Sequence, residues 1–462
     1  MTEHLTSAQG KPESSSGTAA SDKAEGKQRR KVVVTAMIGS VIEYFDFLVF
    51  ATVSSLVFGK LFFPSDNEFV STMLQLSTFA VGFLVRPIGG IIFAHLGDRH
   101  GRQRVLFATF MMMGGATVLI GLLPTYATIG VAAPIILVLL RIVQGLGVGG
   151  EYGGAMVMVL EHTNSTGRRG LYGGLTASSS SGGFLLASAL LAVLTAVTTE
   201  QQFEDWAWRI PFLLSAVLLG IGFYLRLRIE ETPVMKAAVA NGETVRSPLM
   251  EIFRKYPRAV LVSVLMPTGM LVCYSVAMVF SVSYVTANSD VSTPFLLAMI
   301  TVGQVIYVCS TILVGAWSDK VGRRLPMMIG AGGLMVWGFA YFPLVLSGSG
   351  FGIVIAITVT LVLIGCIYGP LATYMSELFG TGVRYTGLSF SYQVNAAIVG
   401  GLTPLVAAGL SEASGSWILV AVMMTVGSVI SFGAVAAGRD TRGSDLNDTH
   451  EEQEAAVAAR VD

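Results

Sequence analysis

The sequence is poor in charge, in cysteine and in histidine. Only 13% of its 462 residues are Asp, Glu, Lys or Arg, against about 25% in a typical soluble domain. Its 3 cysteines and 5 histidines have none of the spacings of a metal or redox site, so we expect no metal and no cofactor. The sequence shows no nucleophile beside a base, the usual sign of a catalytic site, so we do not expect an enzyme. The residues present are 53% hydrophobic, so most of the surface is expected to face lipid.

Long apolar runs account for most of the chain. A helix that crosses a bilayer needs about 20 apolar residues, and twelve runs of about this length can be distinguished. They lie near 32–59, 70–96, 105–123, 131–160, 171–197, 209–227, 259–287, 294–316, 325–346, 351–375, 385–409 and 417–437. The sequence therefore predicts an all-α membrane protein with twelve transmembrane helices.

Hydrophilic segments divide the chain into five parts. The longest interior one, at 228–258, separates six runs from six. We therefore expect an N-terminal six-helix bundle at 32–227 and a C-terminal six-helix bundle at 259–437. A disordered tail at 1–31 and a short acidic tail at 438–462 flank them. The central loop is expected to contain a short interfacial helix, whose residues Leu249, Ile252 and Phe253 face lipid.

Positive charge occurs in alternate hydrophilic segments. If the N-terminus is inside, all 29 Lys and Arg lie in inner segments except Lys60, Arg86, Arg141 and Arg209. Cytoplasmic loops of membrane proteins carry such an excess of Lys and Arg. The pattern predicts that both termini are cytoplasmic.

A basic loop with glycines joins two apolar runs at the same point of each half. A duplication of this kind is expected of a membrane protein built from two parallel repeats. The glycines permit a tight turn, and the charges can pair with neighbouring helix ends and act as a gate at the inner rim. The alternative is that they serve only as topology anchors. The candidate gating residues are Asp98, Arg99, Gly101, Arg102, Arg104, Gly315, Asp319, Lys320, Gly322, Arg323 and Arg324.

Five ionisable groups lie inside the apolar runs of the first half. They are Glu43, Asp46, Arg86, Arg141 and Glu151. Inserting each charge at bilayer depth costs roughly 2.5–3.5 kcal/mol, so they are expected to face protein or a water-filled cavity. Glu43 and Asp46 are three residues apart and share a helix face, while Gln144 extends a polar stripe between Arg141 and Glu151.

These charges predict a proton-coupled anion site. Burial favours the protonated form of a carboxyl group, whereas a nearby arginine favours the ionised form. A carboxylate that loses its arginine to an incoming anion therefore changes its proton affinity, which is the coupling that a symporter needs. We take Asp46, Glu43 and Glu151 as proton-coupling candidates, and Arg86 and Arg141 as groups that bind a carboxylate with a planar fork. The alternative is that all five form static ion pairs between helices.

The polar groups inside the second half are neutral. Buried Tyr, Gln and Asn side chains can hydrogen-bond a substrate in a cavity, although they also pair helices with each other. Proton chemistry is thus expected in the first half and substrate recognition in both. Besides the two arginines, the candidate substrate contacts are Tyr44, Gln144, Tyr274, Gln304, Tyr307, Tyr392 and Asn395.

Several motifs resemble those of a known family. The segment Gly315 to Arg324 is similar to the loop signature of the major facilitator superfamily, and Arg141-x-x-Gln144-Gly145 resembles its fourth-helix signature. More narrowly, segments 42–47, 86–90, 144–154 and 208–212 resemble the metabolite:proton symporter family, whose members carry proline and betaine, α-ketoglutarate, citrate or shikimate. The resemblance covers about residues 30–437. It implies twelve helices, proton symport into a bacterial cell and a central site between the bundles.

Together these observations predict a secondary active transporter in a bacterial plasma membrane, and no enzyme. Its expected cargo is a small organic anion, shikimate-like or a dicarboxylate, because Arg86 and Arg141 both carry positive charge. The alternative is a zwitterionic osmolyte such as proline or betaine. The expected partners are the substrate, the proton and the lipid bilayer, with no nucleic acid, and the expected state is a monomer.

Overall fold

The computed structural model describes residues 15–100, 102–149, 152–163, 167–226, 248–380, 383–439 and 441. Within these ranges the chain forms helices and short connections, and no β-strand. The first half contains α1 (Ser15–Val53), α2 (Gly59–Phe62), α3 (Glu68–Leu84), α4 (Arg86–His100), α5 (Arg102–Leu122), α6 (Tyr126–Ile129), α7 (Ala132–Gly149), α8 (Tyr152–Thr163), α9 (Arg169–Val197), α10 (Glu200–Gln202) and α11 (Arg209–Arg226).

The second half is also helical. It contains α13 (Pro248–Lys255), α14 (Pro257–Leu265), α15 (Thr268–Ser275), α16 (Ser281–Asn288), α17 (Thr293–Val321), α18 (Arg324–Leu346), α19 (Gly350–Glu377), α20 (Arg384–Asn395), α21 (Gly401–Ser414) and α22 (Ile418–Ala437). Single π-helical turns continue α1, α15 and α20 as η1 (Ser54–Phe58), η4 (Val276–Phe280) and η5 (Ala396–Gly400). Such turns often occur at functional sites.

The apolar helices coincide with the predicted runs. Among the described residues, 10 helices are long and apolar enough to cross a membrane, and 11 if Glu200–Ala207 and Arg209–Tyr224, which meet at 42°, form one span. The third predicted run is occupied by the shorter apolar helix Phe107–Leu122. The all-α membrane fold is confirmed, and the number twelve stays a prediction.

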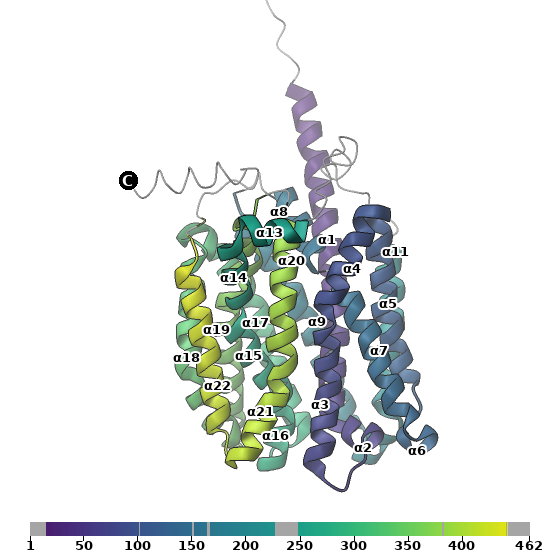
Figure 1. The fold of residues 1–462 in the computed structure, drawn as a ribbon. Coiled ribbons are helices and arrows are strands. Elements are labelled where there is room, and N and C mark those ends of the chain that lie inside the picture. Colours follow the sequence, from purple (N-terminus) through teal and green to yellow (C-terminus); the bar gives the residue numbers. More distant parts are fainter. Residues whose placement is uncertain are drawn as a thin grey trace, which may run out of the picture.

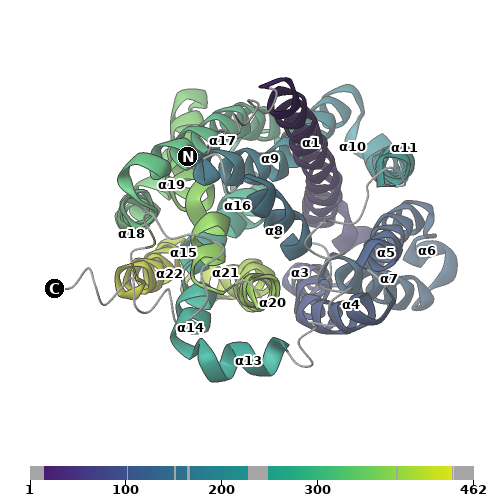
Figure 2. The ribbon, with the colours of Figure 1, turned by 90° about the horizontal axis from the view of Figure 1, so that it is seen from above.

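The long helices lie side by side along one direction (Figure 1). Seen from above, helices α3, α4, α5, α7 and α11 gather on one side, and the green to yellow helices of the second half on the other (Figure 2). At the boundary α9 packs against α17, and α3 packs against α21. The residues between the two halves are therefore drawn from both parts of the sequence.

Glycines allow α9 and α17 to approach closely. A Cβ atom on Gly315 would lie 2.5 Å from the carbonyl oxygen of Gly170, and one on Gly170 would lie 2.4 Å from that of Gly315. Both distances are below any real Cβ contact, so a larger residue at either position would push the helices apart. Small residues are the usual means of close helix packing in lipid. Gly315, predicted as a gating residue, therefore sets the contact between the halves.

Two parts of the predicted organisation need correction. Residues 15–31 are the first turns of α1 and not part of a disordered tail. From Ala19 onward this segment consists mainly of Ala, Lys, Glu, Gln and Arg, which favour helix, and it extends a helix already formed by the apolar run. The central helix α13 is present, but Ile252 is fully buried against protein and does not face lipid, since α13 packs on α14 and α20.

Candidate functional site

A cavity lies between the two halves of the chain. Its space measures about 630 Å³, including the part open to solvent, which is within the usual range for a small-molecule site. Helices α1, α3, α4 and α9 contribute lining residues from the first half, and α15, α17, α19, α20 and η5 from the second. The polar lining residues are Glu43, Tyr44, Arg86, Ser180, Tyr274, Ser275, Tyr307, Tyr368 and Tyr392.

Glu43 and Arg86 are the charged groups of this lining. The guanidinium carbon of Arg86 lies 3.8 Å from the ring centre of Phe83 and 5.6 Å from that of Phe47. This stacking fixes the plane of the guanidinium through a cation–π interaction. Its buried Nε atom has no hydrogen-bond partner among the described residues. Arg86 is thus an oriented donor with capacity left for an anion.

Hydroxyl groups join the two halves across the cavity. The Oη atom of Tyr44 lies 3.3 Å from that of Tyr368 and 3.5 Å from that of Tyr392. Ser180 Oγ donates to Tyr368 Oη at 3.1 Å. Tyr44 and Ser180 belong to the first half and the other two tyrosines to the second. These hydroxyls can exchange their mutual hydrogen bonds for bonds to a polar substrate.

Gln304 and Asn395 lie behind this lining. Gln304 is fully buried, and its Nε2 atom donates to Tyr274 Oη at 3.2 Å. Asn395 Nδ2 donates to Thr268 Oγ1 at 2.8 Å. Because Gln304 supplies a donor to the tyrosine oxygen, the hydroxyl proton of Tyr274 remains available for another acceptor. Neither residue is among those that line the cavity.

Asp46 is buried one helical turn away from Glu43, outside the cavity lining. Its exposed fraction is 1%. Thr117 Oγ1 of α5 donates to Asp46 Oδ2 at 2.9 Å, and Ser215 Oγ of α11 donates to Asp46 Oδ1 at 2.5 Å. Among the described residues, no arginine or lysine forms an ion pair with Asp46. The carboxyl group is therefore held by two hydroxyls.

A chain of hydrogen bonds leads from Asp46 to Arg141. Gln144 Nε2 donates to Thr117 Oγ1 at 2.8 Å, and Arg141 Nη1 donates to Gln144 Oε1. The Arg141 guanidinium lies 3.7 Å from the ring centre of Phe50 and donates to the Phe79 carbonyl oxygen at 3.3 Å. The structure thus places Arg141 and Gln144 behind the cavity, together with Asp46. The sequence predicts an anion site with two arginines, but in the structure Arg86 lines the cavity and Arg141 does not.

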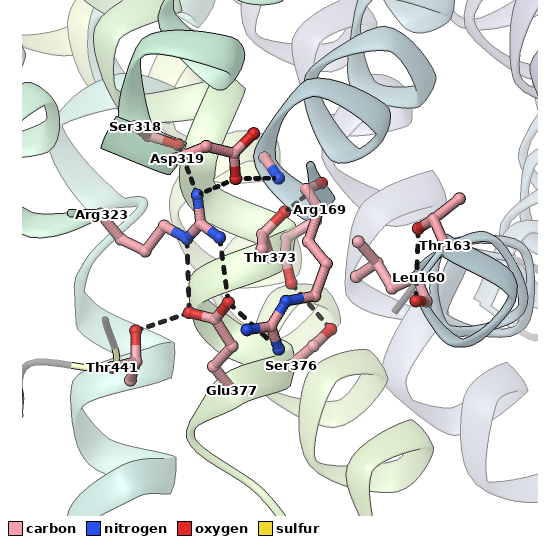
Figure 3. A network of polar contacts seen from close by, with 12 residues as sticks. Leu160, Thr163, Arg169, Ser318, Asp319, Arg323, Thr373, Ser376, Glu377 and Thr441 are labelled. Atoms are coloured by element: carbon pink, nitrogen blue, oxygen red, sulfur yellow. Dashed lines mark hydrogen bonds and ion pairs between the residues drawn. The ribbon is translucent and has the colours of Figure 1, made fainter. Parts of the chain in front are cut away.

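A second polar cluster lies at the end of α17. Gly170 and Leu171 donate their backbone N–H groups to Asp319, at 2.8 and 3.0 Å. Arg323 pairs with Asp319 at 2.7 Å and with Glu377 at 3.2 Å. Figure 3 shows that Glu377 is reached by Arg323 from the second half and by Arg169 from the first, the latter at 3.6 Å. We call Arg169, Asp319, Arg323 and Glu377 the loop cluster.

The carboxylates of the loop cluster keep Arg323 charged. Burial lowers the pKa of Arg323, but the Glu377 and Asp319 carboxylates outweigh this effect and raise that pKa above its ordinary value. The side chain of Glu377 is fully buried, with 0% exposure. A buried carboxylate left without its cations is strongly destabilised, so Arg323 and Arg169 both stabilise Glu377 in its buried position.

Other predicted gating residues have different positions. Gly322 has a φ of 90°, which an L residue rarely adopts, so the predicted tight turn is confirmed. Lys320 is exposed, and Arg324 donates to the carbonyl oxygens of Val435 and Ala436 at the end of α22. In the first copy of the loop, Asp98 and Arg99 belong to α4, and Arg102 and Arg104 belong to α5. The structure describes the backbone of these four residues but not their side chains. Gly101 and Glu151 lie outside the described residues.

Comparison with known proteins decides the family. The model of the Major Facilitator Superfamily matches residues 36–401. The chain belongs to this superfamily. It is therefore a multi-pass membrane transporter and not an enzyme.

Relatives and solved structures of the superfamily agree with this assignment. The inner membrane metabolite transport protein YhjE of Escherichia coli is 37% identical over 83% of this chain and 88% of its own length. A putative proline/betaine transporter of Staphylococcus aureus is 34% identical over 94% of both chains. The crystal structure of a D-xylose-proton symporter matches with a TM-score of 0.69 at 17% identity, covering 90% of this chain and 99% of that one. This last likeness shows the shared fold.

The cavity of this transporter is lined by some of the predicted site residues and by others that the sequence analysis did not identify. Glu43, Tyr44, Arg86, Tyr274, Tyr307 and Tyr392 line it as predicted positions. Tyr368 and Ser180 were missed, although a polar residue inside the apolar run of α19 is the same signal that pointed to Tyr307. Thr117 and Ser215 were also missed, because a hydroxyl inside a transmembrane helix most often bonds its own backbone. Glu377 and Arg169 are identified only by the fold that joins them.

Proposed function

We propose that this transporter is a proton-coupled importer of a small hydroxylated monocarboxylate, of the shikimate-like kind. The observation that carries the proposal is Arg86, whose buried Nε atom lacks a hydrogen-bond partner in the described part of the chain. The cavity around it is also lined by Tyr44, Tyr274, Tyr307, Tyr368 and Tyr392. A planar guanidinium binds both oxygens of a carboxylate. Tyrosine hydroxyls donate to and accept from substrate hydroxyls.

The charge in the cavity limits the number of carboxylates. Arg86 offers one positive group, and Glu43 adds a negative one to the same lining. A second substrate carboxylate near Glu43 would meet like charge at low dielectric, which is unfavourable. Since Arg141 lies behind the cavity, a monocarboxylate fits better than a dicarboxylate.

Asp46 is the proposed proton site, because its surroundings can accommodate both protonation states. When Asp46 is ionised, the Thr117 and Ser215 hydroxyls both donate to it. Each hydroxyl also has a backbone acceptor within reach: Thr117 Oγ1 lies 3.0 Å from Met113 O, and Ser215 Oγ lies 3.3 Å from Pro211 O. A protonated Asp46 can therefore donate to one hydroxyl, whose own proton turns to the backbone. If Asp46 is excluded by experiment, Glu43 and Glu151 are the next carriers to test.

The chain from Asp46 to Arg141 offers a route by which the proton affects the helices. Protonation of Asp46 changes which way Thr117 donates, and Thr117 accepts from Gln144. Gln144 in turn holds Arg141, on the same helix, α7, that packs on α3 and α4 beside Phe83 and Arg86. We propose that proton binding at Asp46 and substrate binding at Arg86 influence each other through this packing of α7 on α3 and α4.

The loop cluster is the proposed gate. It joins α9 of the first half to α17 and α19 of the second through ion pairs and backbone hydrogen bonds. Rocking of the two halves about the cavity would break the Arg169–Glu377 pair and the bonds to Asp319 together. Alternating access then consists of making and breaking this cluster.

The remaining organisation is proposed as the sequence predicts it. We propose twelve spans in two bundles, at 32–227 and 259–437, both termini in the cytoplasm and a monomer in a bacterial plasma membrane. The described ends of the chain at α1 and α22 lie at the same end of the helical body (Figure 1), which supports a common side for both. The name of the Escherichia coli relative places that protein in the inner membrane.

A zwitterion is the second candidate cargo. Glu43 in the same lining can hold a cationic group while Arg86 holds a carboxylate, and the rings of Phe47 and Phe184 also line the cavity. Aromatic faces attract alkylated ammonium groups. A relative named as a putative proline/betaine transporter favours the same candidate.

Transport by the purified protein in proteoliposomes with an imposed pH gradient tests the proposal. Radiolabelled shikimate represents hydroxylated monocarboxylates, α-ketoglutarate represents dicarboxylates, and proline and betaine represent zwitterions. We expect accumulation of the monocarboxylate when the outside is acidic, and its loss when the gradient is collapsed. Accumulation of proline or betaine alone would establish the second candidate, and equal uptake with and without the gradient would contradict proton coupling.

A further inference from the structure

The last turn of α22 is fastened to neighbouring helices by two arginines. Arg324 donates from Nε to the Val435 carbonyl oxygen at 3.2 Å and from Nη2 to that of Ala436 at 2.7 Å. Arg258 Nη2 donates to the carbonyl oxygen of Ala437 at 3.0 Å. Carbonyl groups at a helix C-terminus lack intrahelical partners and attract cations. The chain therefore leaves α22 at a fixed position.

The segment that follows α22 continues toward the loop cluster. Tyr374 Oη donates to the carbonyl oxygen of Arg439 at 2.7 Å, and Arg439 Nη2 donates to the backbone carbonyl oxygen of Glu377 at 2.9 Å. Thr441 Oγ1 donates to Glu377 Oε2 at 2.6 Å and is 3% exposed. Figure 3 shows Thr441 on the side of Glu377 away from Arg169. The chain thus returns to the carboxylate that Arg169 and Arg323 bind.

We propose that Arg439 and Thr441, which follow α22, are part of the gate, with Thr441 as a positioning residue for Glu377. This inference rests on the proposed role of the loop cluster. Thr441, Arg323 and Glu377 all belong to the second half, and Arg169 belongs to the first. Thr441 and Arg323 fix the Glu377 carboxylate before Arg169 arrives, so that the pair between the halves forms without loss of side-chain freedom at Glu377.

Loss of the Thr441 hydroxyl should weaken the closed gate for two reasons. Among the described residues, the buried Glu377 Oε2 atom would keep its bond from Arg323 Nε, at 3.4 Å, and an incompletely satisfied buried carboxylate is destabilised. The side chain would also be free to turn away from Arg169. Both effects act on the closed arrangement, so the carrier should spend more time with its cavity open toward the loop cluster.

Cysteine labelling in the full-length protein measures that opening. Cys273, Cys309 and Cys366 are replaced by alanine, and Ala396, which lines the cavity, becomes the reporter as Ala396→Cys. A membrane-impermeant maleimide is applied to either face of oriented membrane vesicles. We expect Thr441→Val to raise the labelling rate from the loop-cluster face roughly tenfold, the effect of one hydrogen bond to a charged group, and to lower it from the opposite face.

Matched variants separate this role from a general loss of structure. Thr441→Ser keeps the hydroxyl and should restore the labelling of the parent. Thr195→Val removes a hydroxyl that donates to backbone carbonyl oxygens of its own helix α9, at Leu191 and Ala192, and should leave labelling unchanged. A rise from both faces in Thr441→Val would indicate a disrupted fold and would overturn the inference, as would equal labelling in the valine and serine variants.

Arg323→Ala distinguishes failure of this inference from failure of the gate. If Arg323→Ala opens the cavity and Thr441→Val does not, the loop cluster is the gate and Arg439 and Thr441 are not part of it. If neither variant changes labelling, the gate itself is wrong and the role of Thr441 falls with it.

Discussion

Glu43 and Asp46 are two buried acids on the same helix, yet their surroundings differ. Glu43 lines the cavity with Arg86, whereas Asp46 lies behind it, held by Thr117 and Ser215 and linked through Gln144 to Arg141. Three residues correspond to about 60° around a helix axis. That rotation is enough to direct one carboxyl group toward the cargo and the other toward α5 and α11.

The comparison of Glu43 with Asp46 indicates that cargo recognition and proton binding take place at different carboxyl groups. A carboxylate in the cavity changes its environment whenever cargo enters. A carboxylate behind the cavity changes only when the helices around it move or when it binds a proton. We therefore propose that Arg86 and Glu43 recognise the cargo and that Asp46 binds the proton.

The largest effect is expected from Asp46→Asn. This variant should lose accumulation against a gradient entirely, because an amide cannot take up and release the proton, while exchange of cargo across the membrane continues. Uptake of labelled cargo under an imposed pH gradient, beside counterflow without one, measures both. Ser77→Ala, which removes a hydroxyl bonded to its own helix at Met73, is the control and should retain both activities. Accumulation at the rate of the parent would mean that the proton binds elsewhere.

Arg86→Gln should have the next largest effect, on cargo affinity. The KM for an anionic cargo should rise roughly 100-fold, because a charge-assisted bidentate interaction of about 2.7 kcal/mol is lost. A neutral analogue, such as the amide of the same acid, should be affected far less. Initial-rate kinetics with both compounds decide the matter, and equal changes in KM would make Arg86 a purely structural residue.

Thr117→Val should lower the rate of proton-driven uptake by roughly tenfold and leave KM within about twofold, since one hydrogen bond to Asp46 is lost outside the cavity. Thr117→Ser should restore the rate. The same rates measured across external pH should show a shifted pH dependence in the valine variant alone. A change in KM with an unaltered pH profile would place Thr117 with the cargo instead of the proton.

Tyr368→Phe should have the smallest effect, a rise in the Kd for cargo of roughly threefold to tenfold, because one neutral hydrogen bond to the cargo is removed. Tyr341→Phe is the matched control, since Tyr341 bonds Ser281 in the second half, away from the cavity. Binding titration of the purified protein with the cargo gives the two affinities. The cargo role of Tyr368 is contradicted if the two variants bind equally well.

The sequence predicts the helices better than it predicts their faces. Apolar runs and loop charges are local signals, and the predicted runs coincide with the apolar helical segments of the described chain. Whether Asp46 or Glu43 faces a cavity depends on where α5 and α11 pack, and no spacing along α1 contains that information. Arg141 was assigned to the cargo for the same reason: its charge is evident in the sequence, but its position over Phe50 follows from the fold.

Contacts between distant segments account for the remaining differences. The repeated loop identified Asp319 and Arg323, but their partners Arg169 and Glu377 come from the starts and ends of other helices. The role of Thr441 depends on the path of the chain after α22. The start of α1 was misjudged because polar composition was taken as evidence of disorder, although Ala, Lys, Glu and Arg also favour helix.

Proton uptake coupled to cargo entry tests the separation of the two acids most directly. Purified protein in proteoliposomes containing a pH-sensitive dye is supplied with cargo, and the change in internal pH is recorded for Glu43→Gln and Asp46→Asn at saturating cargo. The account predicts a proton signal in Glu43→Gln and none in Asp46→Asn, although both exchange cargo. A proton signal that survives in Asp46→Asn and disappears in Glu43→Gln would contradict it.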